Sequence, residues 1–159
     1  MSLIFDTHAH YDDEAFDADR EALLTSMPEY GVGLILDPGC DLESSRRAVE
    51  LARTYPHVYA AVGWHPENCA PYTEESLEAL RAWAQEPKVA AIGEIGLDYY
   101  WEQNPPRELQ QRVLRDQLAL AQELDMPVIL HDREAHADSL AIVQEFPAVR
   151  GVFHCFSGS

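Results

Sequence analysis

The chain repeats one unit along its length: a short apolar or β-branched run, a turn, and a longer stretch with helical periodicity. The six runs predict strands at residues 3–7, 32–36, 58–62, 89–94, 128–131 and 151–154. Helices are expected between them at roughly 14–30, 41–54, 73–85, 106–125 and 136–146, with Asp41 and Thr73 as N-caps. This alternation predicts an α/β fold in which a parallel sheet is connected by right-handed crossovers.

The length of the chain constrains the architecture further. With 159 residues, one domain is the default, and an eight-stranded α/β barrel of typically about 250 residues is too long to fit. The last predicted strand, at 151–154, is followed by five residues and lacks the helix that follows every earlier strand. The repeat is therefore expected to be interrupted.

Charge and cysteine usage limit the partners and the compartment. The 28 acidic and 11 basic residues give a net charge of −17, which disfavours broad binding to duplex nucleic acid. A small site that holds divalent metals can still accept a phosphate. Cys40, Cys69 and Cys155 are odd in number and form no CxxC pair, as is typical of free thiols in the cytoplasm. The N-terminus has no basic region typical of a signal peptide, and no apolar run predicts a membrane span.

Most histidines fall at one kind of position. Of the seven, five lie at or just past the carboxyl end of a predicted strand, and Glu94 ends another strand. The five are His8, His10, His65, His131 and His154. The carboxyl ends of parallel strands are where the active sites of α/β barrels and sheets lie, so this edge is the expected place for chemistry.

Each of these residues also has a simpler interpretation. His8 and His10 can chelate one metal, with Asp6 behind them on the same face, but a single HxH pair also fits two solvated side chains. Glu94 needs a metal, an arginine or several donors, because a buried unpaired carboxylate is costly. His131 and His154, taken singly, fit core histidines that bond to the backbone. Together these residues predict a metal site.

Five motifs, in order along the chain, resemble the TatD-like metal-dependent hydrolases of the amidohydrolase-like barrel group. They are FDTHAH at residues 5–10, GWHP at 63–66, GEIGLDY at 93–99, HDR at 131–133 and HCFSG at 154–158. The resemblance implies a TIM-type (β/α)8 barrel with two adjacent divalent metal ions at its carboxyl face. It also implies phosphodiesterase activity, often 3′-to-5′ exonuclease activity on DNA.

The resemblance also implies roles for individual residues. His8 and His10 are expected to bind one metal, His131 and His154 the other, and Glu94 to bridge the two. His65 and Arg133 are expected to contact the substrate phosphate. The metals are Zn²⁺, Mg²⁺ or Mn²⁺, since four histidines and a glutamate suit Zn²⁺ and phosphodiester hydrolysis commonly uses the other two.

The family's last motif is not found. The resemblance implies one more catalytic Asp, after the eighth strand, as the general base. We therefore expect residues 1–159 to form a single, incomplete barrel domain that supplies about six of eight βα steps. The natural protein is expected to continue for roughly 90 to 110 residues beyond Ser159, the balance of a complete barrel.

Several functional alternatives stay open at this stage. The same metal arrangement hydrolyses amides and esters of small substrates, and an incomplete chain can be inert. The expected partners are nucleic-acid ends or small phosphodiesters, without a membrane and without an evident obligate protein partner. Tyr99, Tyr100 and Trp101 follow the Glu94 motif, where they either stack on a base or pack the loop.

Overall fold

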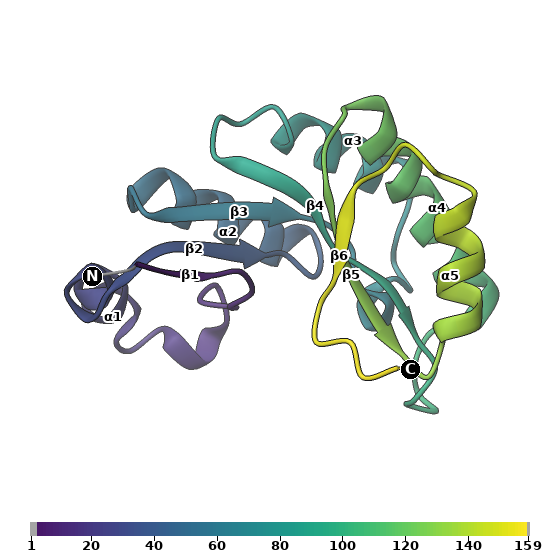
Figure 1. Ribbon diagram of the computed structural model, residues 1–159, viewed down its shortest axis with the longest axis horizontal. Coiled ribbons are helices and arrows are strands. Elements are labelled where there is room, and N and C mark those ends of the chain that lie inside the picture. Colours follow the sequence, from purple (N-terminus) through teal and green to yellow (C-terminus); the bar gives the residue numbers. More distant parts are fainter. Residues whose placement is uncertain (1–2, 159) are drawn as a thin grey trace.

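The computed structural model describes residues 3–158, which form six parallel strands in one curled sheet (Figure 1). The strands follow chain order across the sheet: β1 (Ile4–Asp6), β2 (Val32–Pro38), β3 (Val58–Val62), β4 (Val89–Asp98), β5 (Val128–Arg133) and β6 (Gly151–Phe153). Each strand is parallel to its neighbour, with helical crossovers between them. The predicted α/β fold is confirmed.

Four of the five expected helices form as single units. They are α2 (Leu42–Thr54), α3 (Glu74–Trp83), α4 (Arg107–Glu123) and α5 (His136–Gln144). The N-caps Asp41 and Thr73 are confirmed, since each side chain accepts a hydrogen bond from the third helical residue within a capping box. A short 3₁₀ turn, η3 (Pro66–Asn68), follows β3.

The single helix expected at 14–30 is wrong. This segment divides into η1 (Glu14–Phe16), α1 (Arg20–Ser26) and η2 (Met27–Tyr30). Pro28 cannot continue the α-helical hydrogen bonding, so α1 ends before it. The Arg20 side chain donates to the carbonyls of Tyr11 and Asp13, which fixes the irregular chain ahead of α1.

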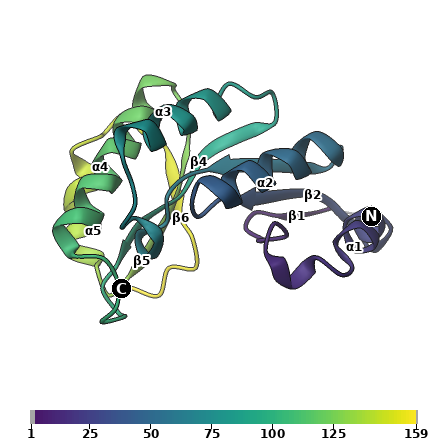
Figure 2. The same ribbon diagram turned by 180° about the vertical axis from the view of Figure 1, so that it is seen from behind.

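The helices α2, α3 and α4 lie on one face of the sheet, in front of it in Figure 2 and behind it in Figure 1. Alternation along β3 shows the two faces: Ala60 and Val62 belong to the main core, whereas Ala61 packs with Ala91 and Ile129 in a small second cluster. Both sides of the central strands are therefore apolar and closely packed.

Three predicted strands are longer than expected. β4 runs four residues past Glu94, because its ladder with β5 continues to the pairing of Asp98 with Arg133. The sequence had indicated that Glu94 ends this strand, but Glu94 lies within β4. β2 likewise reaches Pro38, and β5 reaches Arg133, so His131 lies within β5 rather than at its end.

The outer strands differ from the centre of the sheet. In the described part of the chain, β1 pairs only with β2 and β6 only with β5. Their side chains are correspondingly exposed, with Ile4 at 57% and Val152 at 56%. No helix among residues 3–158 has the length and hydropathy that a membrane span requires.

Candidate metal centre

Glu94 lies at the middle of a group of histidines. It is buried, and its Oε2 atom lies 3.2 Å from His8 Nε2 and 3.6 Å from His10 Nε2. His8 and His10 follow the end of β1, and their two Nε2 atoms lie 3.0 Å apart. Two imidazole nitrogens and one carboxylate oxygen therefore converge on one point, as ligands of a single cation do.

The other oxygen of Glu94 faces a second set of imidazoles. Oε1 lies 3.2 Å from His131 Nδ1, and it lies 3.9 Å from both His65 Nε2 and His154 Nε2. Each of these histidines comes from the carboxyl side of a different strand, β3, β5 or β6. The structure thus brings together all five predicted metal ligands, and their binding of metal stays a prediction.

His65 lies closer to this group than its expected contact with substrate requires. Its ring meets the ring of His131 edge to face, with centroids 4.3 Å apart, and its Nδ1 accepts a bond from the backbone N–H of Glu67. Together with Glu94 and His131 it offers three ligand atoms within 4.8 Å of one another. The geometry therefore allows His65 to contact either a metal or a substrate.

The two edge strands meet at this group although they do not pair. The rings of His8 and His154 are stacked, with centroids 3.5 Å apart and planes 9° apart. The curl of the sheet thus brings the carboxyl ends of β1 and β6 together around Glu94.

Asp98 is a site residue that the sequence analysis missed. It is fully buried at the end of β4, and its Oδ2 lies 2.9 Å from His131 Nε2. Its Oδ1 accepts bonds from the backbone N–H of Tyr100 and the side-chain amide of Asn104, both at 3.0 Å. A carboxylate that holds the far nitrogen of a histidine is a common support for a metal ligand.

A signal for Asp98 exists in the sequence. Strand alternation extended from Glu94 places Gly96 and then Asp98 on the same face. The predicted strand ends at Glu94 and therefore does not include Asp98.

The charge states of this group suit metal ligands. Burial alone would raise the pKa of Glu94, but the hydrogen-bonding imidazoles outweigh it and hold that pKa well below its usual range. Burial lowers the pKa of His65 to about 4, so its imidazole is neutral at pH 7. A metal ligand needs an ionised carboxylate or a neutral imidazole, and these two side chains supply them.

His10 and His131 each lie between two carboxylates. Burial works to lower their pKa values, but Glu94 together with Asp12 raises that of His10, and Glu94 together with Asp98 raises that of His131. The negative charge that favours these protons also favours a divalent cation in the same place.

Arg133 lies outside the ligand group, at the outer end of β5. Its guanidinium stacks on Tyr100, 3.9 Å from the ring centroid, with Trp101 at 5.2 Å. Arg133 also lines a pocket of about 360 Å³ together with His131 and His154. The arginine is thus placed beside two of the predicted metal ligands.

The aromatic residues after β4 divide into two roles. The Tyr99 hydroxyl donates to Asp138 at 2.9 Å, so this residue packs the loop against α5. Tyr100 and Trp101 are 49% and 43% exposed. Their exposure leaves these two rings accessible to solvent, beside Arg133.

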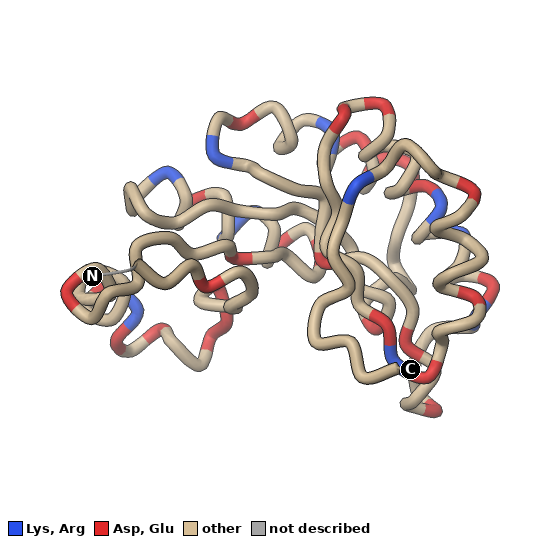
Figure 3. The backbone as a smooth tube through the Cα atoms, viewed as in Figure 1, with Lys and Arg blue, Asp and Glu red and all other residues tan. Residues whose placement is uncertain are grey.

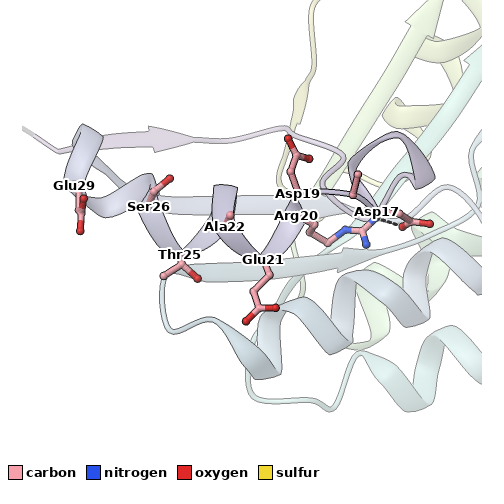
Figure 4. Close-up of a pocket in the computed structure, with 9 residues that line it drawn as sticks. Asp17, Asp19, Arg20, Glu21, Ala22, Thr25, Ser26 and Glu29 are labelled. Atoms are coloured by element: carbon pink, nitrogen blue, oxygen red, sulfur yellow. Dashed lines mark hydrogen bonds and ion pairs between the residues drawn. The ribbon is translucent and has the colours of Figure 1, made fainter.

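A separate hollow of about 550 Å³ runs along α1 and contains none of the predicted site residues (Figure 4). Its polar side chains point outward, and Arg20 is paired there with Asp17 at 2.7 Å. This open polar surface has no arrangement of reactive groups comparable with the Glu94 group.

Comparisons with known proteins identify the family of the chain. The family described as TatD related DNase matches residues 5–159. The chain is 41% identical to the uncharacterized metal-dependent hydrolase YabD of Bacillus subtilis, covering 99% of this chain and 62% of that protein. It is 38% identical to the 3′-5′ ssDNA/RNA exonuclease TatD of Cronobacter turicensis, covering 98% of this chain and 60% of the relative.

A solved structure gives the same result for the fold. The crystal structure of YjjV, a TatD homolog from Escherichia coli, superposes with a TM-score of 0.89 at 40% identity, covering 98% of this chain and 61% of the other. The chain thus spans about three fifths of the length of these relatives. On its motifs, its fold and the match over residues 5–159, the chain belongs to the TatD-related DNase family.

Proposed function

We propose that this chain forms the metal-binding face of a divalent-metal-dependent phosphodiesterase that removes nucleotides from the ends of nucleic acids. The observation that carries the proposal is the position of Glu94, whose two oxygens face separate sets of imidazoles. The exonuclease name of the Cronobacter relative supports the choice of substrate.

The residues present fit two divalent cations. His8 and His10 would hold one with Glu94 Oε2, and His131 and His154 the other with Glu94 Oε1. Imidazole and carboxylate donors suit Zn²⁺ or Mn²⁺, and Mg²⁺ binds through the carboxylate and water. When bound, such a pair supplies an activated water and neutralises charge on a phosphoryl oxygen.

The protein's own groups have distinct tasks in this proposal. Asp98 holds His131 Nε2, so that Nδ1 stays directed toward Glu94. Arg133 positions the substrate phosphate, since a planar guanidinium bonds two phosphate oxygens at once. The ring of Tyr100 stacks on this guanidinium and holds it in place. The general base is proposed to be an Asp in sequence beyond Ser159.

Charge favours the end of a strand over a long duplex as substrate. The net charge is −17, and acidic residues are spread along most of the chain (Figure 3). A polyanion is repelled by most of this surface, whereas a single end can reach the cation site.

A small amide or ester is the second candidate substrate. The Bacillus relative is named only as a metal-dependent hydrolase, without a substrate. A cation held by the same residues would polarise a carbonyl oxygen as well as a phosphoryl oxygen.

We place the protein in the cytoplasm, a choice supported by three cysteines that form no disulfide within residues 3–158.

The test uses the complete natural polypeptide and a single-stranded DNA oligonucleotide labelled at its 5′ end. With Mn²⁺ or Mg²⁺ we expect a ladder of labelled products that shorten from the 3′ end, and no products with EDTA or with Glu94→Gln. A parallel panel of small amides and esters measures the alternative. Hydrolysis of the panel without any oligonucleotide shortening would reject the nuclease proposal.

A further inference from the structure

A second group of acidic side chains lies behind His10, away from Glu94. Asp37 is the second-last residue of β2 and is fully buried, and Asp12, in the segment after β1, is 5% exposed. Within the described residues, neither carboxylate oxygen of Asp37 has a hydrogen-bond partner, and Oδ1 of Asp12 has none. Two buried carboxyl groups therefore lie close together, and no side-chain donor among residues 3–158 bonds to them.

The nearby arginines do not neutralise these carboxyls. Arg20 and Arg47 reach Asp12 only at its backbone carbonyl oxygen, at 3.3 and 3.4 Å. Arg20 pairs with Asp17, and Arg47 pairs with Glu43 and Glu14. A buried carboxylate without a counter-charge is strongly unfavourable, so this pair requires either a cation or a shared proton.

We propose that Asp12 and Asp37 bind a divalent cation at a site of their own, next to His10 and separate from the Glu94 group. The ligand atoms of Asp12, Asp37 and His10 all lie within 4.8 Å of one another. Oxygen ligands at about 2.0–2.6 Å from an ion span separations of this size. Carboxylate oxygens are hard ligands, which favours Mg²⁺ or Mn²⁺ over softer metals.

His10 lies between the two sites. Its Nε2 faces Glu94, whereas its Nδ1 lies 3.9 Å from Asp12 Oδ1. A cation on the two aspartates fixes the position of the Asp12 carboxylate. That carboxylate in turn holds the Nδ1 side of the His10 ring, which faces away from Glu94. The site thus supports a residue of the proposed catalytic group without belonging to it.

The test measures Mn²⁺ bound per chain in the complete natural polypeptide, by elemental analysis after equilibrium dialysis. Wild type, Asp37→Asn and Glu94→Gln are compared. Asp37→Asn is expected to lose one equivalent relative to wild type, and Glu94→Gln to keep that equivalent. Equal Mn²⁺ content in wild type and Asp37→Asn would overturn the site and assign the pair to a shared proton.

Thermal unfolding gives a second readout and controls for folding. In EDTA, Asp37→Asn is expected to unfold at the same or a higher temperature than wild type, because asparagine has the same shape without the buried charge. Added Mn²⁺ should then raise the unfolding temperature of wild type more than that of the variant. An equal rise in both proteins would contradict the proposal.

Asp12→Asn is the second variant and replaces Asp37→Asn in both measurements if the latter does not fold. The outcome is independent of the proposed function. Loss of metal from the Glu94 group, or absence of nuclease activity, leaves the difference between wild type and Asp37→Asn intact.

Discussion

The central strands of the sheet and its two outer strands contribute residues to the same site, but the central strands are buried and the outer strands are exposed. β3, β4 and β5 are covered on both faces, and Ile92, Ile95 and Leu97 in β4 are fully buried. β1 and β6 are three residues long each, and Ile4, Phe5 and Val152 are more than half exposed. The same curled sheet thus has a rigidly packed interior and open edges.

This difference extends to the site itself. The side chains of Glu94, in β4, and of His65, after β3, are 4% and 11% exposed. Of the histidines that follow the edge strands, His8 is also 11% exposed, whereas His10 and His154 are 36% and 31% exposed. One part of the candidate metal centre is therefore fixed by the core. The other part depends on how the edge strands are held.

The largest effect is expected in stability. Ile92→Ala in β4 should cost about 2–5 kcal/mol of unfolding free energy, because it leaves a cavity in the core. The same substitution at Ile4 in β1 should cost under about 1 kcal/mol, because that side chain is already exposed. Denaturant unfolding of residues 1–159 measures both, and equal costs would remove the distinction between centre and edge.

A smaller effect is expected from the carboxylate that supports His131. Asp98→Asn should weaken Mn²⁺ binding about 10- to 100-fold while the ligands stay in place. Asp132→Asn is the matched control, since Asp132 is also a buried aspartate paired with a histidine, His136, at 2.8 Å. Calorimetric titration of both variants checks this, and equal losses would show a general effect of buried Asp–His pairs.

A variant of Arg133 tests whether this side chain contacts the substrate or belongs to the metal-binding group. Arg133→Lys should raise KM for an oligonucleotide about tenfold and leave metal content unchanged, because lysine cannot bond two phosphate oxygens in a fixed geometry. Arg150→Lys, at the opposite end of the sheet, is the control. A loss of metal with unchanged KM would place Arg133 in the metal-binding group instead.

The smallest effect is expected from the ring under Arg133. Tyr100→Leu removes the stacking of the guanidinium at 3.9 Å, an interaction worth about 0.5–1 kcal/mol at an exposed position. We expect KM to rise about two- to fivefold and kcat to stay constant. If KM does not change in steady-state assays, the ring only packs the loop.

The sequence was sufficient for the repeating architecture and for the group of five histidines around Glu94. β3 has the predicted bounds, since its apolar run and its ladder end together. β4 does not, because its ladder with β5 continues to the pairing of Asp98 with Arg133, where Asp98 also contacts His131 and Asn104. Such tertiary partners leave no trace in the local periodicity.

The buried acid at Asp37 was missed for a related reason. It ends an apolar strand, as the histidines do, but its neighbour Asp12 is 25 positions earlier in the chain. Only the pairing of β1 with β2 brings the two carboxyls together. Helix interruption at Pro28, in contrast, had a local signal in the proline itself.

The central claim is that Glu94 joins the centre and the edges of the sheet in one metal-binding group. The most direct test is the metal content of the purified natural polypeptide, by elemental analysis, for wild type, Glu94→Ala and Asp132→Asn. The account predicts that wild type and Asp132→Asn hold equal amounts of divalent metal and that Glu94→Ala loses metal. Equal metal content in all three proteins would contradict it.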